Sequence, residues 1–552
     1  MRCRQSVTRI LVGHFFRRFF DNDTIQVEGD TLTTVVRAIA IVAAPGLMVA
    51  FFLQNQYPQR TLWGSIQDQY FFVLFSFVVM GAVSIFELEM LFPDRLDFLI
   101  LSPLSLKPIQ MFAAKATALA GFLCLFLVGC NCFGAIVLPA VSKGFFFRQV
   151  YAHGAAVLLA GVFTSLFFLA LGGVLLCVLD AARFRVVSPL VQMVSVMALA
   201  LLLLHYARCV DSMEAMLSGD LGMARWMPPF WFLGLYEHLL RGDAAPAFAD
   251  EMARYAVRGT AIAAVIALVT YPMAWTRMRR LALEGASSRR QDPRGLSVLA
   301  RSLIHQVIRR PGERAVFHFI GQTMARNNRY QVYLAMYCGT GLALAVSCAV
   351  RLQESGEGLK ASLSSQGLHA VMPLLLFWVI AGLRTAFAFP LNLSSGWVFR
   401  ITGVSIVECT TAAQRWVLMC ALAVMGCVLV VMAMVGWNAR LLLVQVVFGA
   451  CLCLLLTDAF FSQQSVPFNK PRMPGRTSFP LMLTLYVGAF PPFIFWVVHM
   501  EMQMEKNLFK LLLLAVMSAS IHVALDTMRN QSVEVEEEME GYEGEFQLLG
   551  LC

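Results

Sequence analysis

The densest group of polar residues able to do chemistry follows the second long apolar run of the chain. This segment, residues 87–97, reads ELEMLFPDRLD, and a turn of sequence LSPLS follows at 101–105. Carboxylates spaced like Asp94 and Asp97 are able to hold Mg²⁺, because this hard cation prefers oxygen ligands. The candidate site residues of this segment and its continuation are Glu87, Glu89, Asp94, Arg95, Asp97 and Lys107.

Three interpretations of residues 87–97 stay open from the residues alone. The first is a solvated turn with a short helix. The second is a docking element for a cytoplasmic partner, favoured by charged and apolar residues alternating on a segment too short to span a bilayer. The third is a magnesium site like that of membrane prenyltransferases, whose paired aspartate motifs hold a diphosphate through the metal. Asp94-x-x-Asp97 is only a fragment of such a motif, and no second one follows in a later cytoplasmic loop.

The residue patterns needed for ATP hydrolysis by a phosphate-binding loop or for zinc binding are absent from the sequence. The chain has no G-x-x-x-x-G-K-S/T phosphate-binding loop, since the spacing at 356–360 is wrong, and hydrolysis of ATP by that route is excluded. Most of the fourteen cysteines lie in apolar runs, where they behave as small hydrophobic residues. The C-x-C pairs at 130–132 and 451–453 lack the two-residue gap and the histidines of a zinc site. We predict no catalytic residue and no metal site in this chain.

The elements that must position these residues are membrane helices. The chain of 552 residues is 59% hydrophobic and 14% charged, with a mean hydropathy of +0.69. A helix needs about 20 apolar residues to cross a bilayer, and we predict an all-α polytopic protein. The twelve expected spans lie near 33–53, 70–88, 117–139, 153–179, 187–207, 256–276, 330–350, 370–390, 414–436, 440–461, 479–500 and 508–526.

Positive charge predicts the orientation, because Lys and Arg are retained on the cytoplasmic side. The segment between the sixth and seventh spans is the richest in arginine. Its arginines are Arg277, Arg279, Arg280, Arg289, Arg290, Arg294, Arg301, Arg309, Arg310, Arg314, Arg326 and Arg329. Twelve spans then place both termini in the cytoplasm, and we expect a multi-pass protein of the cell (inner) membrane. The net charge of +9 is explained by anionic membrane lipid as a partner, without nucleic acid.

Two segments flank the spans. Residues 11–19 have an apolar and a cationic face at helical spacing, which predicts a helix lying at the interface, with a poorly ordered basic tail as the alternative. The acidic residues from 534 to 545 predict a solvated, disordered tail. Between the fifth and sixth spans, the aromatic stretch 226–238 predicts a short interfacial or re-entrant helix.

Charges avoid the middle of the apolar runs. An ionisable group at mid-bilayer costs about 2.5 to 3.5 kcal/mol on insertion scales, and natural ones usually mark ion paths. Arg37, Lys115, Arg384, Asp458 and His522 all map toward the cytoplasmic ends of their spans. Coupling to an ion gradient is therefore disfavoured, and energy for active transport would come from another polypeptide.

Two short matches indicate a tandem repeat of six spans. The pattern Phe-Pro-x-x-Leu follows the second span at residue 92 and the eighth at residue 389. The pattern Arg-x-x-x-Pro-Leu enters the fifth span at residue 185 and the eleventh at residue 476. We predict a first transmembrane half at 1–280, a basic cytoplasmic linker at 281–328, a second half at 329–528 and an acidic tail at 529–552.

Residues 92–105, together with Lys115 opening the next span, resemble the turn of ATP-binding-cassette type-2 exporter permeases. In that family an acidic stretch precedes a leucine, proline and serine turn. The six-span halves, the N-terminal interfacial helix and the outer hairpin before the sixth span are also similar. The resemblance implies that residues 87–107 form a coupling helix seated on a separate nucleotide-binding ATPase subunit. ATP and Mg²⁺ would be cofactors of that subunit only.

The second half departs from the family pattern, because the sequence LNLSSGWVFR after Pro390 lacks the acids. Arg400 and Glu408 are the candidates for a second coupling segment. Two other function classes stay open. One is a membrane-embedded enzyme acting on a lipid-linked substrate, with Asp94 and Asp97 as metal ligands. The other is a non-transporting membrane scaffold whose working part is the arginine-rich loop.

Overall fold

The computed structural model forms two compact units, Met1–Arg289 and Arg290–Cys552. Each unit is described by itself. The described residues are 7–20, 31–54, 56–57, 59–88, 92, 95–101, 103–104, 106–142, 144–218, 222–283, 308–355, 358–388, 404–461, 467–468 and 479–540.

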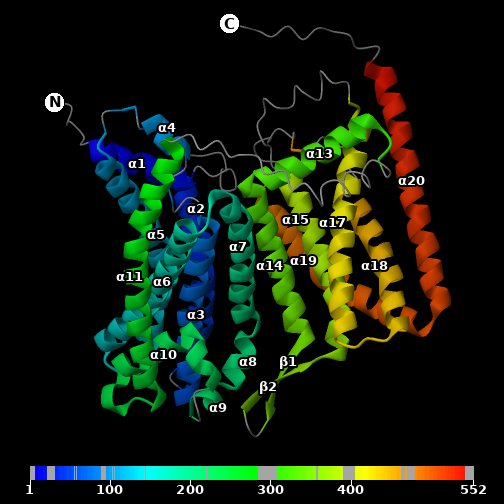
Figure 1. The fold of residues 1–552 in the computed structure, drawn as a ribbon. Helices are drawn as coiled ribbons and strands as arrows, with labels where there is room; N and C mark the ends of the chain where they lie inside the picture. Colours follow the sequence, from blue (N-terminus) through cyan, green and yellow to red (C-terminus); the bar gives the residue numbers. More distant parts are fainter. Residues whose placement is uncertain are drawn as a thin grey trace. The chain divides into compact units, whose positions relative to one another are not determined.

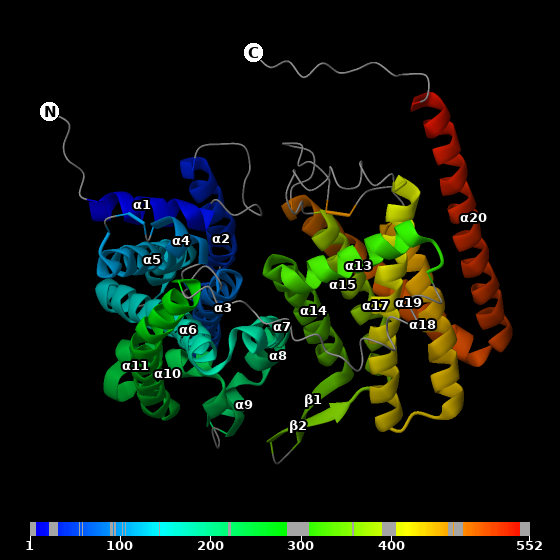
Figure 2. The ribbon, with the colours of Figure 1, turned by 45° about the horizontal axis from the view of Figure 1, so that its top comes forward.

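The first unit begins with a short helix, and its long helices run side by side (Figures 1 and 2). Two short elements, α8 and α9, and the helix α10 lie at the end of this unit away from α1 and α4 (Figure 1). Its elements are α1 (Val7–Phe20), α2 (Thr31–Gln54), α3 (Leu62–Phe86), α4 (Arg95–Leu101), α5 (Pro108–Val141), α6 (Phe146–Val178), α7 (Ala181–Leu204), α8 (Tyr206–Asp211), α9 (Met213–Ser218), η1 (Gly222–Trp226), α10 (Pro228–Arg241), η2 (Gly242–Ala244) and α11 (Phe248–Leu283).

The second unit also begins with a short helix followed by long ones. A two-stranded antiparallel hairpin joins its first two long helices, with Val350 paired to Leu363 and Ser355 to Gly358. Its elements are α13 (Pro311–Arg326), α14 (Asn328–Ala349), β1 (Val350–Ser355), β2 (Gly358–Leu363), α15 (Ser365–Ala388), α17 (Ile406–Met434), α18 (Ala439–Phe460), α19 (Phe479–Lys506) and α20 (Leu508–Glu540).

The predicted all-α polytopic fold is confirmed. Within the described residues, eleven helices are long and apolar enough to cross a membrane. They lie at the places of eleven of the twelve expected spans. The remaining one, 479–500, falls in α19, which is a helix but is not among the eleven. α19 runs through Pro491 and Pro492 without a break. The side chains of its first residues, 479–485, lie outside the described part of the chain.

Three segments differ from the sequence expectations. Part of the expected linker forms α13, whose Val316, Phe317 and Ile320 are buried in the core of the second unit. The helix α20 continues to Glu540, so the first part of the acidic tail is helical. The β1–β2 hairpin was not predicted, because its alternation of polar and apolar residues is too short to stand out beside long apolar runs.

Helix ends follow the local sequence. The Thr61 hydroxyl accepts a hydrogen bond from the Gly64 amide at 3.1 Å and begins α3. Ser405 and Glu408 cap α17 reciprocally, with each side chain accepting from the other residue's amide. α10 ends at Gly242, whose φ of +58° lies in the left-handed region that glycine tolerates.

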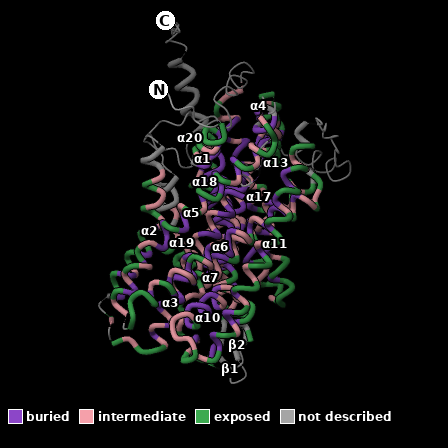
Figure 3. The backbone as a smooth tube through the Cα atoms, turned by 90° about the vertical axis from the view of Figure 1, so that its left-hand side faces the viewer, coloured by how far each residue is buried: buried purple, intermediate pink, exposed green. Residues whose placement is uncertain are grey.

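Buried residues are frequent on some helices of each unit and sparse on others. Figure 3 colours the backbone by burial. In the first unit α3 and α6 lie inside, and Tyr70, Val73 and Ala160 are at most 1% exposed. In the second unit α15 is central, since Met372 and Ile380 are fully buried. Leu, Ile, Val and Phe side chains of α2, α7 and α20 stay exposed, as expected where lipid covers them.

Candidate functional site

The short helix α4 sits at the end of the first unit that also carries α1 (Figure 1). Its apolar residues fix it to the long helices, because Phe98 packs edge-on against Trp275 of α11 at 5.4 Å between ring centroids. Phe92, just before α4, packs against Tyr271 of α11, with 5.4 Å between the ring centroids. Both phenylalanines are buried, so α4 is a packed part of the unit rather than a solvated turn.

A buried aspartate ties α4 to two other helices. Asp97 Oδ2 lies 3.2 Å from Lys115 Nζ on α5, and both side chains are about 5% exposed or less. Asp97 Oδ1 is also paired with Arg18 of α1. Lys115 in turn lies over the Phe15 ring of α1, at 5.4 Å from the centroid. One carboxylate thus links α1, α4 and α5, and burial strengthens such pairs by excluding water.

Apolar side chains are exposed on α4 and on the residues that follow it. Ile100 is 65% exposed, Leu104 is 53% exposed and Ile109, at the start of α5, is 67% exposed. Lys107 is exposed beside them, and its amide donates to Gln110 Oε1. An anchored helix with exposed apolar side chains beside it is suited to be a rigid docking surface for a partner.

The structure places only some of the predicted residues of this segment. Glu87 is buried at the end of α3, and Asp97 is the ion-pair centre. Arg95 begins α4, but its side chain is not described. Glu89 and Asp94 lie outside the described residues.

Among the second-half candidates, Arg400 also lies outside the described residues. Glu408 caps α17 and lies against Gly312 of α13, where an added Cβ would come within 2.6 Å of its Oε2. Arg415 of α17 binds Glu313 of α13 at 2.6 Å. The short helix α13 is therefore tied to α17 by an ion pair, as α1 is tied through Asp97 to α5.

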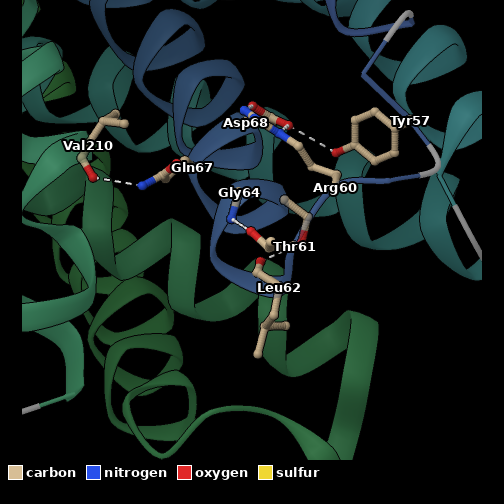
Figure 4. A network of polar contacts seen from close by, with 9 residues as sticks. Tyr57, Arg60, Thr61, Leu62, Gly64, Gln67, Asp68 and Val210 are labelled. Atoms are coloured by element: carbon tan, nitrogen blue, oxygen red, sulfur yellow. Dashed lines mark hydrogen bonds and ion pairs between the residues drawn. The ribbon is translucent and has the colours of Figure 1, made fainter.

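The other end of the first unit carries a polar network around Asp68 of α3 (Figure 4). Arg60 donates to both carboxylate oxygens, from Nε at 2.9 Å and from Nη2 at 2.7 Å, and Tyr57 donates at 3.2 Å. Burial, followed by the Asp68 charge, raises the pKa of Tyr57. The hydrogen bond to Asp68 raises the pKa of Arg60. The Asp68 ion pair therefore fastens the turn before α3 to α3 itself.

Helix α10 lies in the aromatic stretch that predicted a short interfacial or re-entrant helix, and it is largely buried beside this network. Phe230, Phe232 and Leu233 are fully buried. Glu237 is also fully buried and pairs with Arg241 one turn later at 2.5 Å. Burial raises the pKa of Glu237 despite Arg241.

Sequence reasoning also missed a buried polar cluster between α15, α18 and α19. His369 of α15 contacts Glu501 of α19 at 2.5 Å, and Gln445 of α18 also donates to Glu501. Glu501 is 1% exposed. The only sequence signal was a single charged residue close to the end of an apolar run, which does not say what it will pair with.

Comparisons with known proteins add no relative, since no family model, no curated protein and no solved structure matches this chain. The fold itself gives the class. Eleven helices of membrane-spanning length, with lipid-compatible outer surfaces, make this chain a multi-pass α-helical membrane protein.

Proposed function

We propose that this chain is the membrane permease component of an ATP-driven exporter and is coupled to a separate nucleotide-binding subunit. One observation carries the proposal. The short helix α4, between two long helices, is anchored by the Asp97 ion pairs, and Ile100 of α4, Leu104 after it and Ile109 of α5 are exposed. Within this proposal α4 is the element on which the ATPase subunit sits.

The proposal includes an orientation. The arginine-rich segment after α11 supports a cytoplasmic location for the α4 end of the first unit, where ATP is available. Both termini would be cytoplasmic, and the membrane would be the cell (inner) membrane. In the second unit Glu408, which is half-buried at the start of α17, would belong to a second coupling segment.

The proposed coupling is mechanical. Closure of the ATPase subunit on ATP displaces α4, and the buried Asp97–Lys115 pair passes this displacement to α5. A partner that binds one conformation more tightly shifts the population toward it by its difference in affinity. The chain itself supplies the path and no ATP chemistry.

The membrane-enzyme alternative has less support. Asp97 would have to be a metal ligand, yet each of its oxygens already faces a cation, Lys115 or Arg18. Replacing Asp94 and Asp97 by Asn separates the two interpretations. An enzyme would lose prenyl transfer, whereas a permease would lose stimulation of its ATPase partner.

The direct test uses the tagged full chain purified from its own membranes with mild detergent. We expect a nucleotide-binding subunit to copurify and to hydrolyse Mg-ATP. Ile100→Asp with Leu104→Asp should remove both the subunit and the activity, because a charge in an apolar contact is not compensated. Trp226→Asp is the matched control, since Trp226 is 85% exposed at the other end of the unit.

Two outcomes would count against the proposal. One is a purified chain that carries no ATPase subunit under conditions where the chain remains folded. The other is a double variant that keeps full ATPase activity and the same amount of bound subunit.

A further inference from the structure

An arginine of the second unit lies inside a membrane-spanning helix without a carboxylate partner. Arg384 is half-buried in α15, within the span Ser365–Phe387. Within the described part of the chain, no Asp or Glu pairs with it. Other inward cations differ, because Lys115 and Arg415 each contact a buried carboxylate.

The surroundings of Arg384 are aromatic and hydroxylic. Its guanidinium lies over the Phe461 ring, at 5.4 Å from the centroid, which partly compensates a cation away from water. The Tyr486 hydroxyl of α19 interacts electrostatically with it. The neighbouring Thr385 donates to the Tyr337 hydroxyl at 3.1 Å and bonds with Tyr486. None of these groups carries a negative charge.

Nearby sequence supplies no counter-charge either. Segments 389–403, after α15, and 462–478, after Phe461, contain no Asp or Glu. They contain Arg400, Lys470, Arg472 and Arg476 instead. Asp458, near the end of α18, is paired with His522 at 2.8 Å. The sequence of these two segments is therefore basic.

The position of Arg384 along its helix indicates which kind of anion it can bind. Arg384 lies four residues before the end of α15 at Ala388, which is about 6 Å along a helix. A long side chain at this depth reaches the headgroup region. A guanidinium fork matches two oxygens of a phosphate, and anionic lipid is abundant at the cytoplasmic surface.

We propose that Arg384 binds the phosphate of an anionic lipid headgroup, in a site completed by the Phe461 ring and the Tyr486 hydroxyl. This proposal does not depend on the exporter function. A soluble phosphate would offer the same chemistry, and the experiment separates the two sources.

The test measures lipid binding to the purified full chain in detergent by native mass spectrometry. The dissociation constant of phosphatidylglycerol should be about tenfold higher for the Arg384→Gln variant than for the unchanged protein, because the variant loses one charge-assisted contact. Arg384→Lys should be intermediate, since an ammonium lacks the fork. The control is Arg440→Gln, because Arg440 is exposed at the start of α18 and donates to the Glu505 carbonyl oxygen. Phosphatidylcholine should show little difference between the variants.

Inorganic phosphate identifies the source. Displacement of phosphatidylglycerol by inorganic phosphate would support the site with a soluble phosphate as its ligand, and no displacement would support the lipid. Equal phosphatidylglycerol affinity of the unchanged protein and Arg384→Gln would overturn the proposal. If Arg384→Gln weakened the binding of phosphatidylcholine as much as that of phosphatidylglycerol, the proposed selectivity for anionic lipid would be overturned.

A second measurement needs no variant and does not depend on a variant's folding. Phenylglyoxal modifies accessible arginines, and peptide mapping reports each of them. Phosphatidylglycerol should slow modification of Arg384 several-fold and leave Arg440 unchanged. An unchanged rate at Arg384 would contradict the proposed site.

Discussion

Arg415 Nη1 lies 2.6 Å from Oε2 of Glu313, although the two residues are 102 positions apart. Glu313 is 3% exposed, so its charge depends on this partner and on Arg310 at 3.9 Å. The pair joins α13 to α17 and makes a segment of the expected linker part of the second unit. Removing the cation from a buried carboxylate strongly destabilises the folded protein.

The first prediction follows from that pair. Arg415→Met should loosen α13, because Glu313 then keeps only the more distant Arg310. Hydrogen exchange measured by mass spectrometry should become faster across 311–326, while α15 should remain protected. Arg310→Gln is the control and should change exchange much less, since Arg310 is 66% exposed. Unchanged exchange of α13 in Arg415→Met would show that apolar packing alone holds it.

The second prediction concerns the anchor of α4. Lys115→Met removes one of the two cations around Asp97, and breaking a buried pair typically costs about 3 to 5 kcal/mol. Since Arg18 remains, we expect the lower end of that range in unfolding by SDS titration. Replacing Asp97 by Leu as well should restore most of the loss, because the buried carboxylate is then removed together with Lys115, and Arg18, which is 32% exposed, can be solvated. A double variant as unstable as the sum of both single variants would contradict this interaction.

The third prediction concerns the turn before α3. Asp68→Asn should lower the free energy of unfolding by about 2 kcal/mol, because hydrogen bonds to a charged group are each worth about 1.5 to 3 kcal/mol. Solvent screening at Arg60, which is 31% exposed, reduces the effect. Ser65→Ala removes only a local bond to the Leu62 carbonyl and serves as the control. An Asp68→Asn protein as stable as the control would rule out a structural role for the network.

The fourth prediction is a dependence of stability on pH. Burial raises the folded-state pKa of Glu237 above the ordinary value of a glutamate, so the folded state binds this proton more tightly than the unfolded state. Stability from this group is therefore present at low pH and is lost as pH rises from the unfolded value through the folded one. In Glu237→Gln, the free energy of unfolding should depend less on pH over this range.

Glu251→Gln is the matched control for Glu237, because the Glu251 side chain is 32% exposed and pairs with Arg225 at 3.0 Å. Apparent unfolding measured from acidic to neutral buffer should keep its slope in that variant. A slope that survives in Glu237→Gln would assign the dependence to other groups.

Much of the fold could be read from the sequence, because a bilayer imposes a simple rule on every span. Backbone groups in hydrocarbon must be paired within the helix, so each crossing needs a long apolar run. That rule located helices such as α5, α15 and α18. The amphipathic spacing at 11–19 likewise predicted α1, whose Leu11, Phe15 and Phe19 are buried.

The partners of the polar residues were decided only by the tertiary structure. A sequence shows that Asp97 or Glu313 is charged, but not that Lys115 or Arg415 will meet it, because such contacts depend on how distant helices pack. His369 and Glu501 are 132 positions apart and come together for the same reason. Apolar length is a local property that one stretch of chain carries by itself, whereas the pairing of buried charges belongs to the assembled helices.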